Sequence, residues 1–171
     1  MRSCIVQSWP HRCIFVRSVE RVSGQDWREL IHHLMITECY ELGFPVLHDM
    51  READFGTTSE DMLRPGRAAV EPTTPGLVRR VAMVASSDLA FGLMGIVGRL
   101  RDREHHQVRA FRTMGEATSW IDRPSFGDAL PDDVEDILQG QLANQQTQVV
   151  MLKSGSPSKS PCPEHETALP R

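Results

Sequence analysis

The sequence predicts an α/β fold with a small four-stranded central sheet flanked by helices. Short apolar segments of strand-forming residues alternate with segments whose apolar residues recur every three or four positions. The clearest example runs from Arg79 to Ile121, where a strand, a helix, a second strand and a second helix follow one another without interruption. Strands that alternate with one-sided helices bury their apolar surfaces by packing in layers. We therefore expect one layered domain.

The first predicted strand covers residues 12–19, RCIFVRSV. Ser23 then offers a helix-capping side chain, with Asp26 three residues later, and Gly43 is a plausible end to the helical region. A second short strand, 45–50, follows. The helix between these strands should face the sheet through one apolar stripe, made of Trp27, Leu30, Ile31, Leu34 and Met35.

The connection over residues 54–78 is rich in proline and glycine, and it predicts a long loop with one or two helical turns. Residues 79–85 form the next apolar strand. Ser86 or Ser87 caps the helix that follows, and Asp88 lies in its first turn, where negative charge is favourable. The apolar stripe of this helix consists of Leu89, Leu93, Ile96, Val97 and Leu100.

The last predicted strand covers residues 107–112, and a capping box of Thr113 and Glu116 opens the helix after it. Beyond Pro124, the segment PDDVEDILQGQLANQ predicts a short acidic helix. The predicted organisation is an N-terminal extension, a folded domain, a linker that contains this helix, and a disordered tail rich in serine and proline, over residues 1–11, 12–123, 124–152 and 153–171.

Composition excludes several classes of protein. A net charge of −4 argues against general nucleic-acid binding, and no apolar run is long enough to span a membrane. Charged and polar residues interrupt the N-terminus, so we expect no signal peptide. The four cysteines form no CxxC pair, which favours reduced thiols and a cytoplasmic location. We expect no cofactor and no metal site, because adjacent histidine pairs cannot chelate as i, i+4 pairs do and phosphate-binding glycine patterns are absent.

The run RVAMVASSDLAFGL, followed by a long helix, the strand VRAFR and the segment GEATSWI, resembles the SpoIIAA-like group of the STAS superfamily. The helix opened by VSGQDW and the segment PVLHDMREADF are similar to the early part of that pattern. The resemblance covers residues 12–121. It implies a four-stranded sheet with helices, and a non-enzymatic role in binding a regulatory protein or a small apolar, lipid-like ligand.

In the phosphorylated members of that family, a serine lies at a helix N-terminus just beyond a strand-end aspartate. The resemblance places the equivalent region here at Thr57, Thr58 and Ser59, although the usual Asp-Ser-Ser-Gly sequence is absent. A phosphate there would add nearly two negative charges. The alternative, which we favour, is that Thr58 or Ser59 only caps a helix.

Binding residues are predicted where strands end and helices begin, since ligands of α/β proteins bind at strand ends. The candidates for ligand or partner binding are Asp49, Arg51, Ser86, Ser87 and Asp88. Structural roles compete with this interpretation: Asp49 could satisfy loop amides and the serines could serve as caps.

Two other functions stay open. Residues His48, Asp49 and Ser86 or Ser87 could meet in space as a hydrolase or transferase site, although neighbours along a strand face opposite sides. The glycines at i, i+3 and i+6 of the long helix leave a smooth strip that could pack against a helix or form a homodimer surface; these are Gly92, Gly95 and Gly98.

Overall fold

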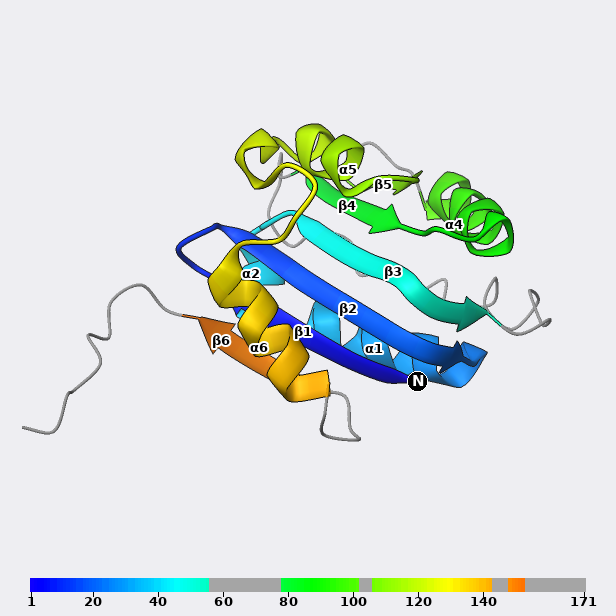
Figure 1. Cartoon of the computed structure of the whole chain (residues 1–171), viewed down its shortest axis with the longest axis horizontal. Helices are drawn as coiled ribbons and strands as arrows, with labels where there is room; N and C mark the ends of the chain where they lie inside the picture. Colours follow the sequence, from blue (N-terminus) through cyan, green and yellow to red (C-terminus); the bar gives the residue numbers. More distant parts are fainter. Residues whose placement is uncertain (56–77, 102–105, 143–147, 153–171) are drawn as a thin grey trace, which may run out of the picture.

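The chain folds around a six-stranded mixed sheet in the computed structural model, which describes residues 1–55, 78–101, 106–142 and 148–152 (Figure 1). The strands lie in the order β5-β4-β3-β2-β1-β6. Four neighbours, β2 to β5, run parallel, whereas β1 pairs antiparallel with β2 and parallel with β6. Their bounds are β1 (Arg2–Ser8), β2 (Cys13–Val22), β3 (Val46–Phe55), β4 (Arg79–Val84), β5 (His106–Phe111) and β6 (Gln148–Leu152).

Helices cover both faces of this sheet. One face packs against α1 (Gly24–Met35), α2 (Glu38–Glu41) and α4 (Asp88–Arg101). The other packs against α5 (Met114–Trp120), the 3₁₀ turn η1 (Pro124–Phe126) and α6 (Asp132–Leu142). Figure 1 shows α6 in front of β1 and β2, with α1 behind the same strands. The predicted α/β class is thus confirmed, and its core is divided into two apolar layers by the sheet.

Three helices begin at the capping residues that the sequence predicted. Ser23 and Asp26 form a reciprocal capping box at α1, and Thr113 and Glu116 form another at α5. At α4, the hydroxyl of Ser87 accepts a hydrogen bond from the backbone N–H of Ala90 at 3.1 Å. Each side chain satisfies an N–H group that the first helical turn leaves without a partner.

The sheet has six strands, not the predicted four. Residues 1–11, expected as an extension, contain β1, which lies inside the sheet between β2 and β6. Residues 124–152, expected as a linker with a short acidic helix, contain that helix as α6 and also the edge strand β6, which was not expected. Helix α6 buries Val134 and Leu138 against the sheet. Strand β6 pairs with β1 from the other end of the chain, and local periodicity does not reveal such a pairing. Strand β1 forms a hairpin with β2, in which Ser8 lies opposite Cys13.

Strand β3 extends five residues beyond the predicted end at Met50. A register shift opposite Arg17 and Val19 inserts one extra residue into β3, as in a β-bulge. Consequently Met50 joins the core on the α1 side, whereas Arg51 and Glu52 both line the opposite face. The bulge therefore places two consecutive charged side chains on the α6 side of the sheet.

No helix in the described ranges is both long enough and apolar enough to cross a membrane.

Candidate functional site

His48 and Asp49 lie in the middle of β3, although they were predicted at a strand end. They point to opposite faces of the sheet: His48 packs on the α1 side, and Asp49 pairs on the α6 side with Arg17, which in turn pairs with Glu135. Ser18 is the hydrogen-bond partner of the imidazole, whereas Ser86 donates to the backbone carbonyl of Arg51. Ser87 caps α4. The predicted hydrolase arrangement of His48, Asp49 and Ser86 or Ser87 is therefore not assembled.

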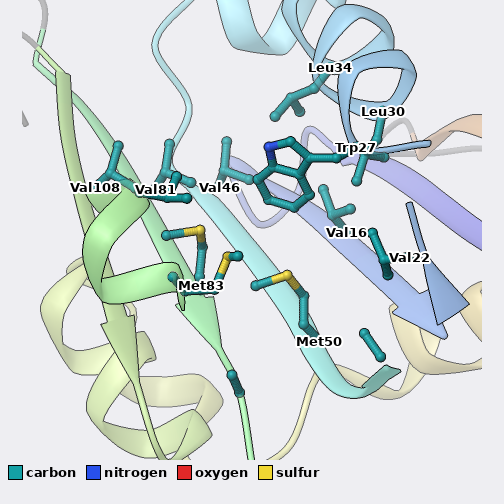
Figure 2. Packing of buried hydrophobic residues seen from close by; sticks show 14 of the residues in the cluster. Val16, Val22, Trp27, Leu30, Leu34, Val46, Met50, Val81, Met83 and Val108 are labelled. Carbon is teal, nitrogen blue, oxygen red and sulfur yellow. The ribbon is translucent and has the colours of Figure 1, made fainter. Parts of the chain in front are cut away.

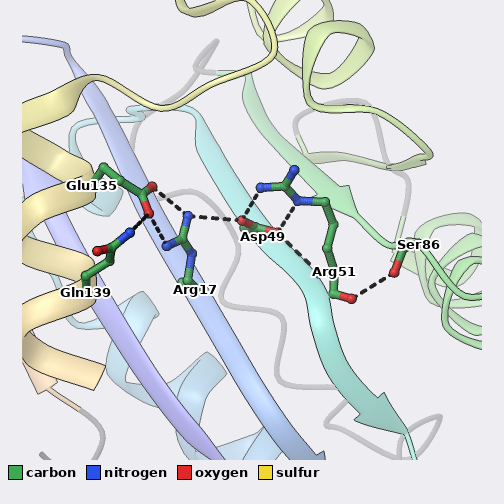
Figure 3. Close-up of polar contacts among 6 residues, drawn as sticks. All are labelled: Arg17, Asp49, Arg51, Ser86, Glu135 and Gln139. Atoms are coloured by element: carbon green, nitrogen blue, oxygen red, sulfur yellow. Dashed lines mark hydrogen bonds and ion pairs between the residues drawn. The ribbon is translucent and has the colours of Figure 1, made fainter. Parts of the chain in front are cut away.

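Asp49 belongs to a chain of charges on the α6 side, in which Asp49 and Arg17 are buried and Arg51 and Glu135 are partly exposed (Figure 3). Arg51 donates to it from Nε at 2.9 Å and from Nη2 at 2.8 Å, and its backbone N–H donates at 3.2 Å. The Nη2 atom of Arg17 lies 3.3 Å from the Asp49 carboxylate. Arg17 also forms a bidentate pair with Glu135 of α6, at 2.6 and 2.7 Å. The chain thus connects β2, β3 and α6.

These carboxylates are held in the charged form. Burial alone would raise the pKa of Asp49, but hydrogen bonds from Arg51 and the charges of Arg51 and Arg17 outweigh burial and lower it. The hydrogen bond from Arg17 likewise lowers the pKa of Glu135. Carboxylates that are fully paired and ionised make poor proton donors, so the geometry favours a structural role for Asp49.

Sequence reasoning missed Arg17, although a signal was present. An arginine within the apolar run RCIFVRSV requires a buried partner, because an unpaired buried charge is very costly. Its partner Glu135 lies 118 residues away. The partner could not be inferred without the fold.

An open groove of about 900 Å³ lies beside this chain, between α6 and strands β2 and β3. Carboxylates and arginines both line it. In the part of the chain that the structure describes, the Nε atoms of Arg2 and Arg17 are buried without a hydrogen-bond partner. The charged lining residues are Arg2, Arg17, Arg51, Glu20, Glu52, Asp128, Asp132 and Glu135. Of the predicted site residues, the groove includes Arg51.

The predicted residues at the start of α4 are held by local contacts. Ser86 bonds to Arg51, Ser87 caps the helix, and the exposed Asp88 pairs with Arg112. Arg112 also donates to the carbonyl of Ser86 at 2.8 Å. Capping and surface pairing explain these side chains.

Thr57, Thr58 and Ser59 lie outside the described residues. The three glycines of α4 differ in their surroundings. A Cβ atom on Gly98 would lie 2.8 Å from the Val108 carbonyl oxygen, so this glycine allows α4 to approach β5 closely. A Cβ atom on Gly92 or Gly95 would meet nothing within 4 Å. The predicted strip therefore has a packing role at Gly98 within the protomer.

The buried thiols have little thiolate character. Cys4, Cys13 and Cys39 are free and buried. Burial raises the pKa of Cys4 to about 11 and that of Cys13 to about 12. Nucleophilic chemistry requires the thiolate, so these side chains act as small apolar core residues.

A buried polar chain on the α1 side ends at His48. Ser3 and Ser18 share a hydrogen bond of 3.0 Å, and Ser18 bonds to Nε2 of His48 at 2.9 Å. Burial lowers the pKa of His48 to about 4, against the weaker opposing effect of Asp49. The ring is therefore neutral at physiological pH. It stacks on Trp27 with ring centroids 5.6 Å apart and planes 6° apart.

Trp27 and His48 line a narrow crevice between α1, α4 and the sheet. Its volume is about 40 Å³, and its walls are mostly apolar (Figure 2). At its rim, the Tyr40 hydroxyl and Nε2 of His106 lie 3.4 Å apart. The full lining consists of Trp27, Ile31, Leu34, Met35, Tyr40, Val46, His48, Val81, Met83, Val97, His106 and Val108. These residues come from helices and strands between residues 27 and 108, so no single sequence motif identifies the crevice.

The indole N–H of Trp27 is the unusual feature of this crevice. Trp27 is 2% exposed, and no hydrogen-bond acceptor reaches its Nε1 atom among the described residues. Figure 2 shows the nitrogen edge of the ring turned toward Leu34 and Val46, which also line the crevice. An unsatisfied buried donor costs about 1–3 kcal/mol. Such a donor marks a place where a bound group could supply the acceptor.

No protein-family model, no curated protein and no solved structure matches this chain. Within the described ranges, no group of three or more histidine, cysteine, aspartate or glutamate residues could hold a metal ion. The features that bear on function are therefore the groove beside Arg17 and the crevice beside Trp27.

Proposed function

We propose that this chain is a non-enzymatic binding module that holds a small apolar ligand in the crevice between α1 and α4. The observation that carries the proposal is a mostly apolar crevice with a buried donor, Trp27 Nε1, that lacks a partner among the described residues. Ligand sites typically combine apolar walls with a few polar groups that orient the ligand. Trp27 and the neutral His48 are such groups here.

The size of the crevice limits what enters it. A volume of about 40 Å³ accommodates roughly three water molecules, since one needs about 10–15 Å³. The crevice as it stands therefore admits a narrow group, such as an alkyl chain, and a wider ligand requires α1 and α4 to separate. Two flexible methionines, Met35 and Met83, line it and can adjust to the shape of a ligand.

The proposal keeps the resemblance to the SpoIIAA-like group of the STAS superfamily. The four strands expected from that resemblance correspond to β2, β3, β4 and β5, which are neighbours in the sheet. This arrangement supports a STAS-like module to which β1, α6 and β6 add further structure. Capture of a small apolar ligand is one of the two roles that the resemblance implies.

Native mass spectrometry tests the proposal. Protein purified gently from its native cells, without detergent, should carry a small apolar molecule that organic solvent extracts. An apo mass in every preparation, together with no binding of added short-chain hydrocarbons, would contradict it.

Binding of a regulatory protein is the second candidate function, and the groove beside Arg17 favours it. Unpaired donors from Arg2 and Arg17 lie among exposed carboxylates, so a partner with side chains of both charges would fit. Cross-linking in native cells should capture such a partner, and Glu52→Lys in the groove should weaken capture. Glu38→Lys, on α2 at the opposite face, serves as the control; equal capture by both variants would exclude the groove.

A further inference from the structure

The apolar ligand should carry a hydrogen-bond acceptor, and the position of Trp27 Nε1 indicates where in the crevice that acceptor lies. This inference rests on the proposed function. The indole N–H is enclosed by the crevice, and within the described part of the chain it has no acceptor. A wholly hydrocarbon ligand would leave that donor unsatisfied. A ligand with an acceptor oxygen near its apolar end would satisfy it.

The surroundings of Trp27 also favour a neutral acceptor over a charged one. The His48 ring stacks on one face of the indole, and its Nε2 atom is already hydrogen-bonded to Ser18. Among the residues that the structure describes, no arginine or lysine lines the crevice. Arg79 of β4 lies nearby but outside the lining: its guanidinium stacks on the Tyr40 ring and donates to the backbone carbonyls of Tyr40 and Glu41. Arg17 and Arg51 are engaged on the opposite face of the sheet. A carboxylate would thus enter a crevice whose described lining offers it no direct cationic partner, which is unfavourable in an apolar site.

We infer that the crevice selects neutral apolar molecules that bear a hydrogen-bond acceptor, such as a ketone, ester or amide carbonyl, and that Trp27 Nε1 donates to that acceptor. Trp27 would act as a specificity-determining residue, because it distinguishes molecules of equal length by one polar atom. The apolar walls, in contrast, supply affinity without distinguishing a ketone from an alkane.

The test uses pentane, 2-pentanone and pentanoate as probes of equal carbon number, in sealed tubes at neutral pH. The chain has three tryptophans, so ¹⁵N–¹H spectra contain three indole resonances, and Trp27→Phe assigns the relevant one by its loss. We expect 2-pentanone to move the Trp27 indole resonance downfield and pentane to leave the N–H without a hydrogen-bond shift. Pentanoate should not bind.

The Trp27→Phe substitution keeps an aromatic ring and removes the donor. The ratio of 2-pentanone to pentane affinity should fall about tenfold in this variant, since one net hydrogen bond corresponds to roughly that factor. The two probes differ in their free energy of transfer from water. This difference cancels when the affinity ratio of the variant is compared with that of the natural protein. If the Trp27→Phe substitution destabilises the fold, replacing Trp9 and Trp120 in turn assigns the Trp27 resonance by elimination, and the indole shift in the natural protein then tests the inference.

The outcomes separate the two proposals. If both neutral probes shift the methyl signals of Val81 and Val97 but the Trp27 resonance stays in place, the ligand binds and the inference about Trp27 is wrong. Water in the crevice would then be the partner of the indole. If no probe shifts those methyl signals, the proposed function itself fails.

Discussion

The imidazole of His48 lies parallel to the indole of Trp27, with ring centroids 5.6 Å apart and planes 6° apart. One ring comes from the middle of β3 and the other from the first turn of α1. Together they form part of the crevice wall, and Ser18 fixes the imidazole from the strand beside it. The same contact therefore packs α1 against the sheet and forms part of the proposed ligand site.

His48 should make stability depend on pH. Its pKa in the folded protein is about 4, below the ordinary value of 6.5, so the unfolded chain takes up a proton first as the pH falls. The stabilisation is thus complete above pH 6.5 and is lost between 6.5 and about 4, with a total on the order of 3 kcal/mol. Urea unfolding of the natural protein and of His48→Gln across this range should show a weaker pH dependence in the variant.

His32→Gln provides the control for that measurement. His32 lies on the exposed surface of α1, outside the crevice lining, so this variant removes an imidazole without disturbing the contact between His48 and Trp27. A His48→Gln profile parallel to that of the natural protein would show that His48 does not remain neutral in the fold.

Arg17 should be essential to the charged chain. Arg17→Met leaves the buried carboxylate of Asp49 with Arg51 alone and removes both bonds to Glu135. Loss of one partner from a buried ion pair costs about 3–5 kcal/mol, and we expect a decrease in the free energy of unfolding of that order.

Arg80→Met is the matched surface substitution, because Arg80 pairs with the exposed Asp122. Exposed pairs contribute about 1 kcal/mol or less. Urea unfolding at pH 7 measures both variants, and similar losses in the two would contradict a buried structural role for Arg17.

Alanine substitutions at Gly95 and Gly98 of α4 should change the stability of the protein in opposite directions. Gly95→Ala adds a methyl group into open space and should stabilise the helix by up to about 1 kcal/mol. Gly98→Ala places a methyl group against the Val108 carbonyl oxygen and should destabilise the protein by about 1–3 kcal/mol. Thermal unfolding compares the two, and a stabilised Gly98→Ala protein would show that α4 and β5 separate readily.

A homodimer through the outer surface of α4 predicts a further effect. Gly95→Leu would disturb such an interface, so analytical ultracentrifugation should show a lower mass than for the natural protein. A folded variant of unchanged mass would remove Gly95 from any dimer surface.

Local signals in the sequence predicted much of the fold. Ser23 with Asp26 and Thr113 with Glu116 cap helices as expected, because a capping box involves residues only three positions apart. The stripe that includes Trp27 and Leu34 faces the sheet for a similar reason. These features depend on periodicity and backbone chemistry within one turn or two.

Strand β1 was missed although its hairpin with β2 is local, because its segment carries only two aliphatic residues with a β-branch, Ile5 and Val6. The other missed features depend on contacts distant in sequence, such as the pairing of β6 with β1. The partnership of Arg17 with Glu135 and the convergence of Trp27, His48 and Val97 on one crevice likewise appear only in three dimensions. Hence the predicted strand-end residues include Arg51 of the charged groove and His48 of the crevice, but the sequence did not predict either hollow.

The most direct measurement of ligand binding is a pentane titration followed through methyl NMR signals in three proteins. Ile31→Trp adds bulk at the partly buried edge of the crevice, whereas Ile36→Trp adds the same bulk at an exposed position just beyond α1. We expect the signals of Val81, Val97 and Met83 to shift in the natural protein and in Ile36→Trp, and to stay unchanged in Ile31→Trp. Equal shifts in all three proteins, or none in any, would contradict a ligand site between α1 and α4.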